Sequence, residues 1–349
     1  MTSSTGTILV TGANGYIASH VVKVLLDNGY NVRGTVRSDK AAAQLRETFP
    51  GFIDKHLSIA FVADLSNSDE FANVIDSSIV GVVHTASPAA YPVEDIVGEI
   101  LEPAIRSSVG VLDAVKRFAD LQRFKRVVHL SSLAAMLDHS KGKRPGYVYS
   151  EDDWNPVTWE QAKGMPNYLD AYEASKALSE RAVWKWMEGN QPWFDITCLC
   201  PSLVLGPHVE RIDRLSEVRS TLRFLWMSLI GSDRIPSLDY GGFTDVRDLA
   251  SMMVVALEAP AVSGKRFLVA RHFDWQTAAD ILRAHFPALR DRIPEGMPGT
   301  GVESAGSSIY SVDGQRIVEV TQISYRPMSE TLVDSTRQLL DIESREQSN

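Results

Sequence analysis

The opening stretch of the chain, up to residue 36, constrains the fold more than any other feature. It contains an apolar, β-branched segment (7–10), a turn with two glycines, a helix with apolar residues at helical spacing (17–25) and a second apolar segment (31–36). Gly29 stands where a helix needs a left-handed C-terminal cap. This order of a strand, a helix and a second strand predicts a βαβ unit.

The same rhythm continues through the first two thirds of the chain and selects a parallel sheet with helices on both faces. Seven short, almost continuously apolar segments are expected as buried parallel strands, at 7–10, 31–36, 57–62, 81–85, 126–130, 195–199 and 265–269. The sequence therefore predicts an α/β protein with a Rossmann-type, doubly wound sheet of about seven strands.

Charge and hydropathy exclude several classes of function. The chain has 44 acidic and 35 basic residues, a net charge of −9, and no long basic run, so we expect no nucleic-acid partner. No apolar stretch approaches the roughly 18 residues of a membrane helix. Residues 1–6 do not resemble an export signal. We therefore expect a cytoplasmic protein that does not bind membranes.

The two cysteines, Cys198 and Cys200, are two residues apart in an expected strand, so both side chains point to one face. Buried free thiols are the expected state, and neither a disulfide nor a metal site is predicted.

The turn after the first strand, TGANGYIA (11–18), places glycines where a backbone approaches a dinucleotide pyrophosphate at a helix N-terminus. The alternative is an ordinary structural turn, since glycine serves both purposes. The residues expected to contact the cofactor in this turn are Gly12, Asn14, Gly15, Tyr16 and Ile17.

The end of the second strand indicates which dinucleotide binds. An acidic residue there accepts from the adenosine ribose and repels a 2′-phosphate, but residues 29–36 contain none. Arg37 follows directly and Lys40 comes three residues later, and a guanidinium can bind a phosphate through two hydrogen bonds. These residues favour NADP over NAD. The alternative is two solvated basic residues on a loop.

The ends of the third and fourth strands meet the same carboxyl edge of the sheet, where open α/β sheets bind their ligands. Asp64 could accept from the adenine amino group, or it could cap the next helix, whose apolar residues are Phe71, Val74 and Ile75. Further cofactor contacts are expected from Leu65, Thr85, Ala86 and Ser87.

A possible catalytic group follows the fifth strand. Tyr172 and Lys176 are four residues apart in an expected helix, so they are neighbours on one face, and the ammonium could lower the pKa of the phenol. Ser131 and Ser132 end the fifth strand, where a hydroxyl can orient a carbonyl oxygen. Such a group supports hydride reduction of a carbonyl. The alternative is a serine turn cap and a surface tyrosine.

Eight segments together resemble the extended short-chain dehydrogenases/reductases, in the group of dihydroflavonol, cinnamoyl-CoA and fungal aldehyde or methylglyoxal reductases. They are TGANGYIASH (11–20), TVRS (35–38), ADL (63–65), HTASP (84–88), HLSS (129–132), YEASK (172–176), PSLVLGP (201–207) and FTDVRDLA (243–250).

The resemblance implies roles for individual residues. Ser132, rather than Ser131, orients the carbonyl, Tyr172 donates the proton, and Lys176 binds the nicotinamide ribose while it lowers the tyrosine pKa. Arg37 contacts the 2′-phosphate. The residues implied at the nicotinamide end are Pro201 and Ser202, with Leu203 beside them and the Ser87-Pro88 turn lining the cofactor.

The implied activity is NADPH-dependent reduction of an aldehyde or prochiral ketone to an alcohol. Dihydroflavonol reductases carry an asparagine five residues after the serine, whereas this chain has Leu137, which argues against a flavonoid. An apolar substrate pocket is expected from Leu133, Met136, Tyr168, Val204 and Trp226.

The expected division of the chain follows from these motifs. Residues 1–206 and 243–270 are expected to form an NADP-binding Rossmann domain. Residues 207–242 and 271–349, where the rhythm weakens, are expected to form a smaller α+β substrate-binding region. We expect a monomer or homodimer with a small-molecule carbonyl substrate.

Three alternatives remain. A sugar-nucleotide epimerase or dehydratase shares the glycine turn and the Tyr/Lys pair, but usually carries an acid at the end of the second strand. A hydroxysteroid dehydrogenase differs mainly in its substrate. A non-catalytic NADP-sensing regulator tends to lack the tyrosine that this chain keeps at position 172.

Overall fold

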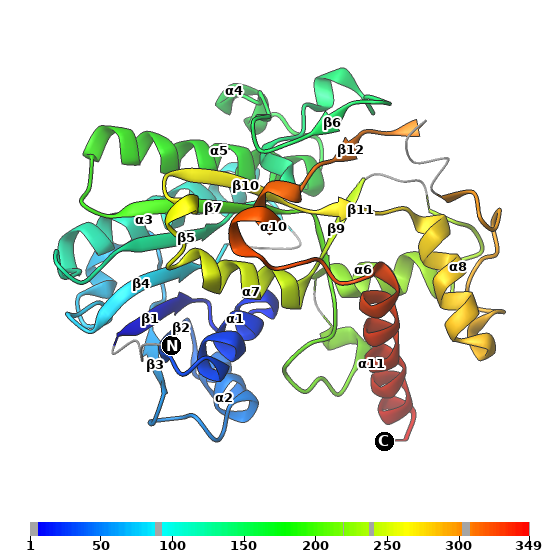
Figure 1. The fold of residues 1–349 in the computed structure, drawn as a ribbon, viewed down its shortest axis with the longest axis horizontal. Coiled ribbons are helices and arrows are strands. Elements are labelled where there is room, and N and C mark those ends of the chain that lie inside the picture. Colours follow the sequence, from blue (N-terminus) through cyan, green and yellow to red (C-terminus); the bar gives the residue numbers. More distant parts are fainter. Residues whose placement is uncertain (1–5, 88–92, 219, 237–240, 302–307, 349) are drawn as a thin grey trace. The chain divides into compact units, whose positions relative to one another are not determined.

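The computed structural model describes residues 6–87, 93–218, 220–236, 241–301 and 308–348 (Figure 1). These residues form two compact units. The first unit takes in 1–138, 151–200 and 250–267, and the second takes in 139–150, 201–249 and 268–349.

The first unit is built on a seven-stranded sheet with the order β10-β7-β5-β4-β1-β2-β3. Neighbouring strands from β3 through β7 are parallel. The strands are β1 (Thr7–Thr11), β2 (Asn31–Val36), β3 (Leu57–Phe61), β4 (Ile79–His84), β5 (Arg126–Leu130), β7 (Asp195–Pro201) and β10 (Lys265–Val269). Each of the seven expected strands coincides with one of these, so the predicted Rossmann-type sheet is confirmed.

Helices lie on both faces of this sheet (Figure 1). They are α1 (Tyr16–Asp27), α2 (Asp39–Thr48), α3 (Glu102–Phe118), which follows the π-turn η2 (Val97–Leu101), and α5 (Tyr168–Asn190). The short α4 (Trp159–Lys163) packs against α5 through Ala162. On one face, Val111 of α3 and Val183 of α5 join a buried cluster with strand residues such as Leu9. Because successive strand residues alternate in direction, Ile8 and Val10 point to the other face, which α1 covers.

Helix α1 forms as the sequence predicts. Its buried residues include Val21, Val22 and Leu25, which give the helix one apolar face. It ends where Gly29, with φ +79°, donates to the Leu26 carbonyl, and Tyr30 donates to the Leu25 carbonyl. This left-handed cap returns the chain directly into β2.

The second unit contains two small sheets. One has the order β11-β9-β8 and the other pairs β12 with β6. Its strands are β6 (Val148–Tyr149), β8 (Leu203–Leu205), β9 (Gly242–Asp245), β11 (Arg271–His272) and β12 (Ser311–Val312). Its helices are α6 (Ser220–Leu229), α8 (Trp275–His285), α10 (Gln315–Thr321) and α11 (Met328–Ser348), and α7 (Val246–Ala256) runs on into the first unit.

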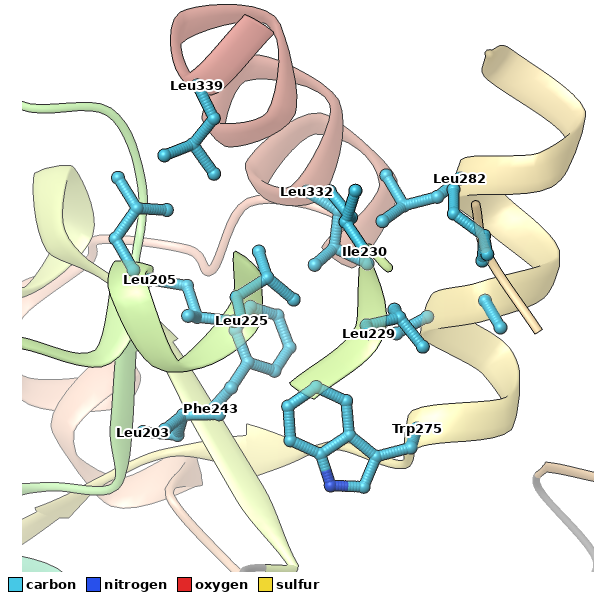
Figure 2. Packing of buried hydrophobic residues seen from close by; sticks show 14 of the residues in the cluster. Leu203, Leu205, Leu225, Leu229, Ile230, Phe243, Trp275, Leu282, Leu332 and Leu339 are labelled. Carbon is cyan, nitrogen blue, oxygen red and sulfur yellow. The ribbon is translucent and has the colours of Figure 1, made fainter. Parts of the chain in front are cut away.

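One hydrophobic cluster holds the second unit together (Figure 2). Leu203 of β8, Phe243 of β9 and Leu225 of α6 pack with Trp275 of α8 and Leu332 of α11. Its members come from residue 203 to residue 342, so this core forms only when segments far apart in the sequence meet.

Candidate active site

The glycine turn has the backbone geometry that a dinucleotide phosphate site needs. Gly12 has φ +63°, and a Cβ there would lie 3.0 Å from the Cβ of Ala86. Gly15 is the N-cap of α1, no side chain caps the helix, and its first turn holds no acidic residue. The amides at this N-terminus are therefore available for a phosphate. Tyr16 and Ile17 begin the helix and are half-buried.

Hydrogen bonds at Thr11 join the ends of β1 and β4. Its Oγ1 accepts from the amides of Thr85 (3.1 Å) and Ala86 (3.2 Å). The Thr85 hydroxyl in turn donates to the Thr11 carbonyl at 2.6 Å. The structure thus brings the predicted residues Thr85 and Ala86 against the glycine turn. Ser87 is exposed, and Pro88 lies outside the described residues.

Arg37 and Lys40 lie at the carboxyl end of β2 and in the first turn of α2. Both are exposed, and in the described part of the chain neither side chain makes an ion pair or hydrogen bond. They are thus accessible to an anion at this edge of the sheet. Nearby, the Asn14 side chain donates to Gln44 Oε1 of α2 at 3.1 Å, a contact that the sequence did not indicate.

Asp64 does not cap a helix, so that alternative is wrong. Its carboxylate accepts from the amide (2.8 Å) and hydroxyl (2.7 Å) of Ser66, and these bonds lower its pKa. The expected helix is only a 3-10 turn (Ser68–Phe71), and Asn67 caps it. Asp64 and the half-buried Leu65 remain predicted cofactor contacts.

The catalytic candidates come from β5 and α5, which are in contact. The Lys176 ammonium of α5 donates to the Leu130 carbonyl of β5 at 3.3 Å, and Ala174 packs in one buried cluster with Ala135. Ser132 begins the short 3-10 turn η3 (Leu133–Ala135), where its Oγ accepts from the Ala134 amide at 3.2 Å.

The two serines have different surroundings. Ser131 is buried, and its hydroxyl donates to the Glu180 carboxylate at 2.5 Å. Ser132 is half-buried, and its hydroxyl proton stays available to another acceptor. Ser132 is therefore the better candidate for binding a carbonyl oxygen.

Tyr172 is half-buried and stacks on Tyr168 with 6.3 Å between ring centroids. Desolvation raises its pKa to about 12, and the charges of Tyr168 and Glu173 add to this rise. Lys176 is not among the groups that shift the pKa of Tyr172, because the Lys176 ammonium is directed at the Leu130 carbonyl. The lowering of this pKa that was expected from Lys176 is therefore not seen. The phenol therefore keeps its proton at neutral pH.

A buried ionic group lies next to Lys176. Glu180, one turn further along α5, is 0% exposed and binds Arg266 through both oxygens, at 2.8 and 3.0 Å. Cys200 Sγ lies 3.6 Å from the same carboxylate. Both cysteines are buried free thiols, as predicted. Burial lowers the pKa of Lys176, while the charges of Cys200 and Glu180 oppose that shift.

Sequence reasoning did not identify Glu180 or Arg266 as part of this site. The only local signal is that Glu180 follows Lys176 at the spacing at which Lys176 follows Tyr172.

Two buried histidines extend this region. His84 and His129 are paired in register on β4 and β5, with ring centroids 5.3 Å apart. His84 Nδ1 lies 2.8 Å from Thr11 Oγ1, and neither Nε2 atom has a partner among the described residues. Burial, with the charge of Lys176, lowers the pKa of His84 to about 3 and also lowers that of His129.

These histidines predict acid sensitivity. Both stay neutral when folded but take up a proton near pH 6.5 when the chain unfolds, so the free energy of unfolding falls as the pH decreases from about 6.5 toward 3. Each contributes at most about 1.4 kcal/mol per pH unit. Urea unfolding at pH 7.5, 6.5 and 5.5 should give a free energy of unfolding that falls less steeply with decreasing pH for His84→Asn than for the parent. Equal slopes for His84→Asn and the parent would contradict this account.

The remaining predicted residues fall in both units. Leu133 and Met136 are buried in the first unit, where Tyr168 begins α5. In the second unit, the Ser202 hydroxyl donates to the Gly242 carbonyl at 2.7 Å, and Trp226 packs partly buried against that unit's core. The other predicted residues there, all buried, are Pro201, Leu203 and Val204.

The described residues contain no cluster of His, Cys, Asp or Glu side chains arranged for a metal ion. In that same part of the chain, no helix is both long enough and apolar enough to cross a bilayer.

The sheet order and the phosphate-type turn define the class, an α/β protein of the Rossmann type. A family model described as the NAD dependent epimerase/dehydratase family matches residues 8–270, which is more than half of the chain. The chain belongs to this family, and the resemblance to extended short-chain dehydrogenases/reductases is confirmed.

Relatives with reductase names match over nearly the whole chain. The NADPH-dependent methylglyoxal reductase GRE2 of Saccharomyces cerevisiae is 34% identical, covering 97% of this chain and 99% of that protein. The ketoreductase azaE of Aspergillus niger is 33% identical, covering 96% of this chain and 97% of that protein. The crystal structure of the yeast methylglyoxal/isovaleraldehyde reductase Gre2 complexed with NADPH superposes with a TM-score of 0.87 at 33% identity, covering 97% of this chain and 99% of that one.

Proposed function

We propose that this protein is an NADPH-dependent carbonyl reductase that converts an aldehyde or prochiral ketone to an alcohol. The observation that carries the proposal is the packing of α5, which bears Tyr172 and Lys176, on the end of β5 and on η3, which Ser132 begins. The relatives whose names describe reductases of methylglyoxal and of ketones support the same activity.

The first unit offers the features that an NADP nucleotide requires. The open N-terminus of α1 suits the pyrophosphate, and the exposed Arg37 suits a 2′-phosphate. Asp64, Leu65, Thr85, Ala86 and Ser87 are proposed to line the cofactor, and Pro201, Ser202 and Leu203 are proposed for its nicotinamide end. NADPH supplies the hydride.

The protein's own residues then manage the carbonyl oxygen and its proton. Ser132 donates a hydrogen bond to that oxygen, which stabilises its developing negative charge. Tyr172 donates a proton to the alkoxide, and its raised pKa keeps this proton in place at neutral pH. Lys176, whose ammonium donates to the Leu130 carbonyl, is proposed to bind the nicotinamide ribose. We propose Leu133, Met136, Tyr168, Val204 and Trp226 as substrate contacts.

Arg37→Ala tests the cofactor assignment. Loss of a charge-assisted contact, worth about 1.5–3 kcal/mol, should weaken NADPH binding about 10- to 100-fold and leave NADH binding unchanged. Fluorescence titration with both nucleotides measures the two affinities, and Arg46→Ala in the last turn of α2 serves as the control. An equal loss of affinity for NADPH and NADH would argue against a 2′-phosphate contact.

An absorbance assay at 340 nm tests the activity itself. NADPH or NADH is combined with a panel of aldehydes, aryl ketones and α-ketoesters. We expect turnover with NADPH on at least one carbonyl class and much weaker turnover with NADH. Tight NADPH binding without reduction of any carbonyl would favour a sensor or an epimerase-like enzyme.

The cellular setting is part of the proposal. The two buried free thiols suit a reducing compartment, so we propose a cytoplasmic enzyme. The net charge of −9 supports a small-molecule substrate without a nucleic-acid partner. We propose a monomer or homodimer, which light scattering distinguishes.

A further inference from the structure

We propose that Glu180 is a positioning residue which, through Ser131, fixes the end of β5 against α5 and so sets the place of Ser132 relative to Tyr172. The inference rests on the proposed reductase function and adds to it a residue that touches neither substrate nor cofactor.

Leu130, the last residue of β5, and Ser131, which follows it, are each hydrogen-bonded to α5, at two successive turns of that helix. The Leu130 carbonyl accepts from Lys176, and the Ser131 hydroxyl donates to Glu180 at 2.5 Å. Tyr172, Lys176 and Glu180 follow one another at four-residue steps, so they share one face of the helix. Ser132 comes directly after the two bound residues, and its position therefore depends on both contacts.

The Glu180 carboxylate is itself held from three other sides. Arg266 of β10 binds it through Nε (2.8 Å) and Nη2 (3.0 Å), Trp184 donates to it at 3.2 Å, and Cys200 of β7 lies 3.6 Å away. Arg266 also donates to the Glu151 and Asp153 carbonyls. The two bonds from Arg266 make this carboxylate a fixed anchor for Ser131.

The segment around Ser132 also has supports outside α5. The Ser131 amide donates to the Leu199 carbonyl of β7 (2.8 Å), and Asn155 binds the carbonyls of Ala134 (3.0 Å) and Ala135 (2.9 Å) in the 3-10 turn η3. The hydrogen bonds from Lys176 to Leu130 and from Ser131 to Glu180 tie the same segment to α5. Because misplacing a catalytic group by about 1 Å can cost about 100-fold in rate, the side-chain contact at Ser131 should matter for turnover rather than for binding.

The test compares Ser131→Ala with Trp184→Phe, since each variant removes one hydrogen bond to the same buried carboxylate. Only the bond removed in Ser131→Ala involves a residue next to Ser132 in the chain. Steady-state kinetics give kcat and KM, fluorescence titration gives the NADPH Kd, and hydrogen–deuterium exchange follows the peptide over 130–136. Thermal unfolding of both variants shows that they are folded to the same extent.

For Ser131→Ala we expect kcat to fall about 10- to 100-fold, KM and the NADPH Kd to stay within about twofold, and exchange at the Ala134 and Ala135 amides to accelerate. For Trp184→Phe we expect kcat and exchange to match the parent. An unchanged kcat or unchanged exchange in Ser131→Ala would overturn the inference, as would an equal loss of kcat in both variants. If the parent reduces no carbonyl, the proposed function fails, and the exchange comparison still decides whether Ser131 holds this segment.

Discussion

Replacing Tyr172 with phenylalanine should lower kcat with NADPH and an accepted carbonyl by about 10²- to 10⁴-fold, the usual contribution of a positioned proton donor. The phenol oxygen is the only atom removed, and the ring that stacks on Tyr168 remains. NADPH affinity should therefore change only a few-fold. Stopped-flow measurement of NADPH oxidation gives the rate, and fluorescence titration gives the affinity.

Tyr30→Phe provides the matched control for this substitution. Burial and Glu258 raise the pKa of Tyr30 to about 12 as well, and its hydroxyl donates to Glu258 at 2.8 Å. Tyr30 precedes the amino end of β2, whereas the predicted cofactor contacts lie at the carboxyl ends of the strands. Loss of this hydroxyl should leave kcat within about twofold. A Tyr172→Phe enzyme with parental kcat would show that another group delivers the proton.

The second large effect concerns stability. Arg266→Met should lower the free energy of unfolding by about 3–5 kcal/mol, because it leaves the fully buried Glu180 carboxylate without its cation. Methionine keeps much of the side-chain volume, so the loss reports mainly the uncompensated charge. Urea unfolding followed by circular dichroism measures the change.

Two comparisons separate this charge effect from a general loss of contacts. Arg33→Met breaks the ion pair with the exposed Asp76, whose side chain is 54% accessible, and should cost no more than about 1 kcal/mol. Adding Glu180→Leu to Arg266→Met removes both charges and should restore most of the lost stability. A cost below 1 kcal/mol for Arg266→Met alone would contradict the account of this ion pair.

The central sheet could be predicted because its strands are largely apolar segments of five to seven residues, each followed by a helix or turn. The expected burial holds for most of them but not for β3, which is at the edge of the sheet and has Leu57 as its one fully buried residue. The strands of the second unit could not be predicted from the sequence. β6, β11 and β12 have two residues each and β8 has three, too few positions for a period of two to be recognised. Their place is set by a core that joins residues from 203 to 342.

The candidate site could be proposed from the sequence where the residues that suggest it are close together in the chain. The glycine turn, Arg37 and the Tyr172/Lys176 spacing each lie within one element or its end. The partners of Glu180 could not be found in this way, because Arg266 is 86 residues away. The sign of the pKa shift at Tyr172 also depends on burial and on the direction of the Lys176 side chain, which spacing alone does not give.

The most direct measurement of the central claim is isotope transfer from NADPH deuterated at C4 of the nicotinamide, in either configuration, to a carbonyl that the enzyme accepts. The account predicts that one of the two labelled cofactors gives an alcohol with a single deuterium on the former carbonyl carbon, detected by NMR and mass spectrometry, and that Tyr172→Phe forms this product about 10²- to 10⁴-fold more slowly. An alcohol without deuterium from both labelled cofactors, or no alcohol from any carbonyl in the presence of bound NADPH, would contradict it.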